Sequence, residues 1–109
     1  MTPVRRGPPR HEIPEVDAAA LEAARAADAA VAAAREAGNE RWLQYLDPLP
    51  NRLRDDRLPD LRGAARLVRA AYGPKDSIRD ALPAEVTEPF LDRIDRLLKA
   101  IARYEAHRD

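Results

Sequence analysis

Four carboxylates in the last third of the chain have a spacing that could bind a metal ion. Glu85, Glu88, Asp92 and Asp95 follow one another at intervals of three, four and three, so a helix would place them on one face. Carboxylate oxygens are the ligands that Mg²⁺ and Ca²⁺ prefer. However, Pro89 interrupts the series, and Asp92 and Asp95 each have a basic residue four positions later. We therefore interpret this face as a solvated, ion-paired helix surface.

The two histidines and the single serine offer little more chemistry. His107 has acidic neighbours at Glu105 and Asp109, but side chains two residues apart on a helix point in different directions, so no metal site is preformed. Ser77 lies where a helix N-cap is required, and no histidine is near it in the sequence. Cysteine is absent, and none of the four glycines belongs to a phosphate-binding pattern. We predict no catalytic residue, no metal site and no cofactor, and expect a protein that is not an enzyme.

Charge and composition narrow the possible classes of protein further. The 109 residues include 19 basic and 19 acidic side chains, and this formal net charge of zero argues against a dedicated nucleic-acid-binding protein. No apolar run is long enough to cross a bilayer and no segment resembles a signal peptide, so we expect a cytoplasmic protein. Alanine accounts for 22 of the hydrophobic residues. Because alanine buries little surface, the core is expected to be small.

Hydrophobic periodicity predicts an all-α fold, and no segment alternates as a strand would. We expect a single helical domain over residues 15–109, built as a small bundle of three long helices and one or two short ones. Residues 1–14 contain four prolines and three arginines and almost nothing to bury, which predicts a disordered tail that adds nothing to the fold. The long helices are expected over residues 15–37, 60–72 and 87–106.

Individual side chains indicate where the helices should begin. Asp17 is a candidate N-cap for the first long helix, and Ser77 opens a sequence with the spacing of a capping box. The last helix is expected to begin around Thr87 or Glu88, which would place Pro89 in its first turn, where proline is tolerated.

Two helix faces have the spacing of a coiled-coil seam, one of small residues on the first helix and one of large residues on the last. Because alanine fills little volume, pairing with a second copy of the chain could complete such a core, so we expect a homodimer. The predicted interface combines both seams with the only tryptophan. Its residues are Ala20, Ala24, Ala27, Val31, Trp42, Phe90, Ile94, Leu97 and Ile101.

The favoured function is a non-enzymatic protein–protein interaction module: an adaptor, an accessory subunit or a self-associating scaffold piece. Trp42 is expected in the core or as a cap, and an exposed binding anchor is the alternative. The alternative function is a small DNA- or RNA-binding regulator. It would use Arg62, Arg66 and Arg69, which share one face of the third long helix and could contact phosphates.

Overall fold

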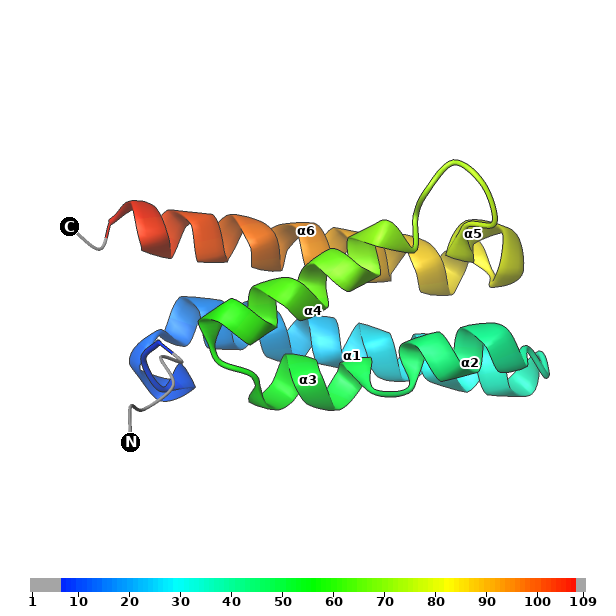
Figure 1. Ribbon diagram of the computed structural model, residues 1–109, viewed down its shortest axis with the longest axis horizontal. Coiled ribbons are helices and arrows are strands. Elements are labelled where there is room, and N and C mark those ends of the chain that lie inside the picture. Colours follow the sequence, from blue (N-terminus) through cyan, green and yellow to red (C-terminus); the bar gives the residue numbers. More distant parts are fainter. Residues whose placement is uncertain (1–6, 108–109) are drawn as a thin grey trace, which may run out of the picture.

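The computed structural model describes residues 7–107, and all the regular structure in that range is helical (Figure 1). Its two 23-residue helices, α1 and α6, lie side by side, α4 packs against α6, and α2 and α3 return along α1. The expected all-α bundle is therefore confirmed. Its elements are η1 (Arg10–Glu12), α1 (Pro14–Glu36), α2 (Glu40–Leu46), α3 (Leu49–Asp55), α4 (Leu58–Ala70), α5 (Ile78–Ala81) and α6 (Ala84–Ala106).

The core is built around the alanine face of α1. The side chains of Ala20, Ala24 and Ala27 are 0% exposed, and α1 contacts α2, α3 and α6. Small side chains on one helix let neighbouring helices approach it closely, so the side chains of those neighbouring helices must fill most of the volume of the core. The largest side chains that are almost completely buried lie outside α1: Leu46, Leu49, Leu53, Leu61, Ile78, Phe90, Ile94, Leu97 and Ile101.

The first helix begins earlier than the sequence analysis predicted. It starts at Pro14, whose missing N–H suits the first helical position, and Ile13 precedes it as the N-cap residue. The Ile13 side chain is only 4% exposed and belongs to the core. Asp17 does not cap the helix, because it lies within the first turn of α1; its carboxylate accepts a hydrogen bond from Arg10.

Arg10 ties the segment before α1 to another part of the bundle. Its Nε donates to Asp17 at 2.8 Å and its Nη1 donates to the carbonyl oxygen of Asp56, just after α3, at 2.7 Å. The predicted disordered tail over residues 1–14 is therefore wrong for residues 10–14. A single buried isoleucine and one arginine give no periodicity, so the sequence pattern did not reveal them. Residues 1–6 of that predicted tail lie outside the described residues.

The turn after α1 and the start of α5 agree with the sequence prediction. Gly38 adopts a φ of +66°, the left-handed conformation typical of a residue that ends a helix. Asn39 then caps α2, accepting a hydrogen bond from the Trp42 N–H at 3.2 Å. Ser77 and Asp80 form the expected capping box at the start of α5.

The last helix also begins earlier than expected, at Ala84, so Pro89 lies inside the helix rather than in its first turn. Proline has no N–H to donate to the carbonyl group four residues before it. Close by, the Tyr72 hydroxyl donates to the Thr87 carbonyl oxygen at 2.5 Å and joins the end of α4 to α6. Burial raises the pKa of the Tyr72 phenol well above its ordinary value.

None of the helices described has the length and hydropathy needed to cross a bilayer.

Shortening Ile13 tests whether the segment before α1 is part of the core. Ile13→Ala should lower the free energy of unfolding by about 2–5 kcal/mol, because it empties a buried site. Leu21→Ala is the matched control: Leu21 is 38% exposed, and the change should cost no more than about 1 kcal/mol. Urea denaturation measures both values. Equal, small losses in the two variants would contradict the packing of Ile13.

Candidate functional site

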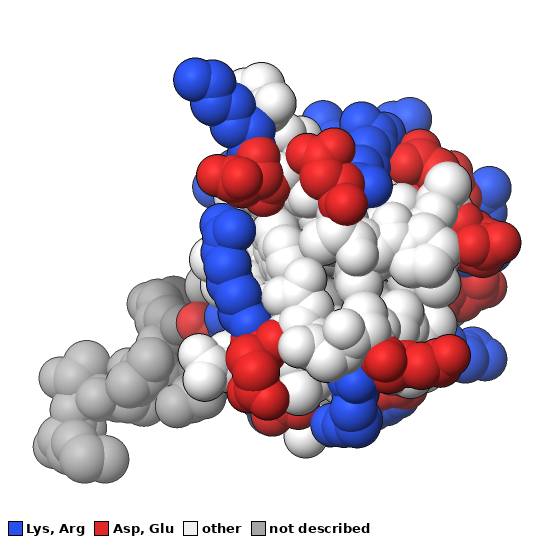
Figure 2. Space-filling view, turned by 90° about the vertical axis from the view of Figure 1, so that its right-hand side faces the viewer, with Lys and Arg blue, Asp and Glu red and all other residues white. Residues whose placement is uncertain are grey.

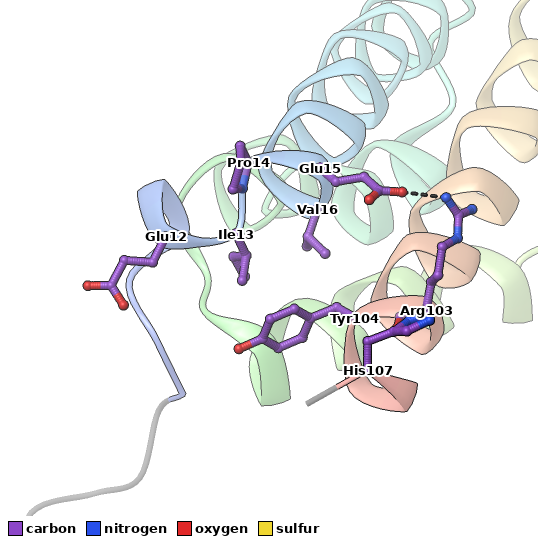
Figure 3. A pocket seen from close by; sticks show the side chains of 8 residues that line it. All are labelled: Glu12, Ile13, Pro14, Glu15, Val16, Arg103, Tyr104 and His107. Carbon is purple, nitrogen blue, oxygen red and sulfur yellow. Dashed lines mark hydrogen bonds and ion pairs between the residues drawn. The ribbon is translucent and has the colours of Figure 1, made fainter. Parts of the chain in front are cut away.

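A cleft of about 440 Å³ lies at the end of the bundle where α1 begins and α6 ends (Figure 3). Its volume falls within the range of ligand-binding clefts. One wall comes from η1 and the first turn of α1, and the other comes from the last turns of α6. We call it the α1–α6 cleft, and its lining residues are Glu12, Ile13, Pro14, Glu15, Val16, Arg103, Tyr104 and His107.

The floor of the α1–α6 cleft is apolar. Ile13 and Val16 belong to the core and are 4% and 1% exposed, whereas Tyr104 is half-buried. Figure 3 shows the Tyr104 ring extending from α6 beneath Ile13 and Val16. The three side chains give the cleft an apolar base, and Tyr104 supplies most of the surface that they leave exposed.

The rim of the cleft carries both signs of charge. Arg103 of α6 forms an ion pair with Glu15 of α1, so the pair spans the two walls (Figure 3). The His107 Nδ1 lies 2.7 Å from the Arg103 carbonyl oxygen, a hydrogen-bonding distance for the tautomer that carries its proton on Nδ1. Glu12 is exposed at the outer edge.

The charged groups of the cleft are mostly engaged with other groups of the chain. The lining includes no serine, threonine, cysteine or lysine, and its ionisable side chains are Glu12, Glu15, Arg103, Tyr104 and His107. The guanidinium of Arg103 is already paired with Glu15, and the His107 ring is held by its own helix. What the cleft does offer is an apolar base with charges placed around it.

The nine residues predicted to form a protein interface lie in the core of the single chain instead. None is more than 9% exposed, because the small-residue face of α1 packs against α6 and the short helices α2 and α3. The small-residue seam of α1 and the large-residue seam of α6 therefore pack against each other within one chain. This corrects the prediction that they form an interface on the surface. The residues concerned are Ala20, Ala24, Ala27, Val31, Trp42, Phe90, Ile94, Leu97 and Ile101.

The aromatic residues of α2 have structural positions. Trp42 is 6% exposed and meets Tyr45 edge to face, with ring centroids 5.3 Å apart. The Tyr45 hydroxyl donates to the Leu67 carbonyl oxygen at 2.5 Å, near the C-terminal end of α4, where carbonyls lack partners within the helix. Burial raises the pKa of Tyr45. The interpretation of Trp42 as a core residue is confirmed.

The arginine stripe of α4 is largely engaged within the bundle. Arg62 forms an ion pair with Glu105, and the Nε of Arg69 lies 3.4 Å from a carboxylate oxygen of Asp95, so both arginines reach across to α6. Arg66 is exposed and forms no ion pair with any residue from 7 to 107. The structure thus uses two of the three predicted phosphate-binding residues to join α4 to α6.

Three of the four carboxylates on the acidic face of α6 are ion-paired, whereas the exposed Glu85 forms no ion pair with any residue from 7 to 107. Arg79 donates to both carboxylate oxygens of Glu88, at 2.8 and 3.1 Å, and this hydrogen bonding holds the pKa of Glu88 below its usual range. Asp92 lies 3.1 Å from Arg96 in the expected i, i+4 pair. Asp95 pairs with α4 rather than with its own helix. No group of three metal-ligating side chains occurs among the residues described.

Sequence patterns could not predict the α1–α6 cleft, because the residues of its two walls are far apart in the chain. The residues of η1 were assigned to a tail, and His107 was considered only with its neighbours Glu105 and Asp109, the second of which lies outside the described residues. The one available indication was Ile13, an isolated large apolar residue among prolines.

Comparison of the chain with models of protein families, with curated proteins and with solved structures found no match.

The ion pairs of α4 predict weak binding of duplex DNA. A fluorescence anisotropy titration at about 50 mM salt should give a dissociation constant no tighter than about 10 µM, as for sequence-independent binding. Arg66→Glu should change that value no more than the control Arg25→Glu, which alters an exposed arginine of α1. Submicromolar binding that Arg66→Glu alone abolishes would establish the nucleic-acid function instead.

Proposed function

We propose that the protein is a non-enzymatic protein–protein interaction module and that its α1–α6 cleft accepts a large apolar side chain of a partner protein. The observation that carries the proposal is the apolar floor of Ile13, Val16 and Tyr104 within a charged rim. Protein interfaces commonly place an apolar anchor in a central pocket and surround it with polar contacts.

The apolar floor supplies the affinity in this proposal. Because Ile13 and Val16 are already almost completely buried, a partner would gain mainly from covering the exposed part of Tyr104, at about 25 cal/mol for each Å² of apolar surface. A single well-seated side chain can thereby dominate the binding free energy. The half-buried Tyr104 is the largest side chain that a partner would cover.

The charged rim supplies orientation. Glu12 and Glu15 lie on the α1 side of the cleft, whereas Arg103 and His107 lie on the α6 side. A partner with a basic residue on one side of its apolar anchor and an acidic residue on the other would match both walls. Complementary charges of this kind mainly affect specificity and association rate.

Two other interpretations have less support. A DNA- or RNA-binding regulator would depend on the stripe of Arg62, Arg66 and Arg69, of which two are paired with α6. A homodimer remains a prediction, but it would have to use a surface other than the buried seams. The partner is therefore taken to be another protein, and a second copy of this chain is an outcome that the experiment distinguishes.

Selection of displayed peptides tests the proposal with a defined probe. Peptides enriched on the protein should share one large apolar residue flanked by charges. Tyr104→Ala should weaken their binding at least about tenfold, as expected for a hot-spot contact. Leu67→Ala, at an apolar residue of α4 that is 43% exposed, should change it less than about twofold.

Circular dichroism would confirm that both variants remain folded, and light scattering of the unliganded protein would report a second copy. Peptides that bind both variants equally, or whose binding depends on charge without an apolar residue, would contradict the proposal. A dimer that Tyr104→Ala separates would support the cleft and identify the partner as this chain.

A further inference from the structure

A second cavity lies at the opposite end of the bundle from the α1–α6 cleft. Its volume is about 180 Å³, and it forms where the start of α2 meets the loop before α5. Figure 2 views this end of the molecule, which has a centre without charged side chains and a rim of both signs. We call this cavity the α2–α5 pocket, and its lining residues are Asn39, Arg41, Trp42, Asp76, Ser77, Asp80 and Ala81.

One wall of the α2–α5 pocket is an aromatic ring on which a cation already lies. The guanidinium carbon of Arg41 is 5.4 Å from the centroid of the Trp42 ring, within the range of a cation–π interaction. The Trp42 side chain is firmly held, because it is only 6% exposed and the Tyr45 ring meets it edge to face. The Trp42 backbone N–H donates to Asn39 and fixes the start of the helix that carries the ring. The structure thus contains a rigid indole with a guanidinium from the exposed Arg41 beside it.

The opposite wall supplies carboxylates. Asp80 accepts a hydrogen bond from the Ser77 N–H at 3.3 Å, which fixes one carboxylate oxygen through the capping box. Asp76 is exposed, with a φ of +51°. Neither aspartate forms an ion pair with any residue from 7 to 107. Two carboxylates therefore line a pocket in which Arg41 is the one basic lining residue.

The loop that carries these carboxylates is tied back to the bundle. The Ile78 N–H donates to the Ala71 carbonyl oxygen at 2.9 Å, which closes the loop between α4 and α5. The Ser77 Oγ accepts from the Arg79 N–H at 2.9 Å, and Ser77 is only 7% exposed. Trp42 and Asp80 are therefore held in place before any ligand arrives, whereas the exposed Asp76 side chain is free to turn toward a ligand.

We propose that the α2–α5 pocket binds the guanidinium group of an arginine side chain from a partner protein. The ligand would take the place of Arg41 on the Trp42 ring and donate hydrogen bonds to Asp76 and Asp80. A guanidinium fits this set because it is planar, stacks on aromatic rings and donates in a fixed fork to carboxylates, whereas an ammonium is a compact point charge. This inference does not rest on the α1–α6 cleft, so either site can fail without the other.

The fluorescence of Trp42, the only tryptophan in the chain, measures this binding directly. Titration with N-acetyl-arginine amide should give a saturable change in emission. N-acetyl-citrulline amide, an uncharged analogue of nearly the same shape, should give none. N-acetyl-lysine amide should bind more weakly than the arginine probe, and added salt should weaken the binding of both.

Two variants and a control assign the binding to the α2–α5 pocket. Asp76→Asn should weaken binding of the arginine probe at least fivefold, and asparagine tolerates the positive φ of this position. Arg41→Ala should tighten binding at least twofold, because it removes the internal competitor for the Trp42 ring. Asp55→Asn, at an exposed aspartate at the end of α3, should leave binding unchanged.

Several results would overturn the proposal. If Trp42 emission does not change with the arginine probe, the pocket does not bind a guanidinium. Equal responses to the arginine and citrulline probes would contradict the proposal in the same way. Equal effects of Asp76→Asn and Asp55→Asn would show that binding occurs elsewhere. Lysine binding as tight as arginine would overturn the assignment to a guanidinium.

Discussion

The close approach of the other helices to the alanine face of α1 is the contact on which the rest of the structure depends. Eight residues of α1 are buried, and six of them are alanines. Side chains this small leave the volume of the core to be filled from α6 and from the shorter helices, which supply phenylalanine, isoleucine and leucine. The core is therefore formed by small side chains on α1 and large side chains on the surrounding helices. Interdigitation of such side chains is how protein cores reach close packing.

Ion pairs between helices are frequent on the surface of the bundle. The flanks of the bundle are crossed by ion pairs between helices, such as Glu22 with Arg93 and Asp28 with Arg54. Exposed pairs of this kind contribute only about 0–1 kcal/mol each, but they occupy charged groups that would otherwise be free to bind ligands. The two cavities proposed as binding sites lie instead at the two ends, where helices begin, end or change direction. Both proposed sites lie at the ends, although the Glu15–Arg103 pair spans one of them and the flank beside the Glu22–Arg93 pair has a further cavity of about 390 Å³.

The sequence predicted the helices well because their patterns are local. Apolar periodicity located the long helices, and Ser77 and the Gly38–Asn39 pair marked boundaries through side-chain caps and a left-handed turn. Heptad spacing also identified the buried faces of α1 and α6 correctly. It does not say what buries them, so a packing contact inside one chain was interpreted as an interface between two.

The candidate sites could not be predicted in the same way, because each depends on segments that are distant in the chain. The α1–α6 cleft joins Ile13 to Tyr104, and the α2–α5 pocket joins Trp42 to Asp76. Spacing along a helix carries no information about such pairs. Trp42 was recognised as a candidate from its residue type alone, but its position beside two carboxylates required the fold.

Enlarging one alanine of the α1 face tests the central claim most directly. Ala24 is 0% exposed and Ala29, on the same helix, is exposed, so Ala24→Leu and Ala29→Leu add the same side chain to opposite faces. Measured by urea denaturation, Ala24→Leu should lower the free energy of unfolding by about 1–3 kcal/mol or more, because it forces the packed helices apart. Ala29→Leu should change it by no more than about 0.5 kcal/mol. A fully folded Ala24→Leu variant as stable as the wild-type chain would contradict the account.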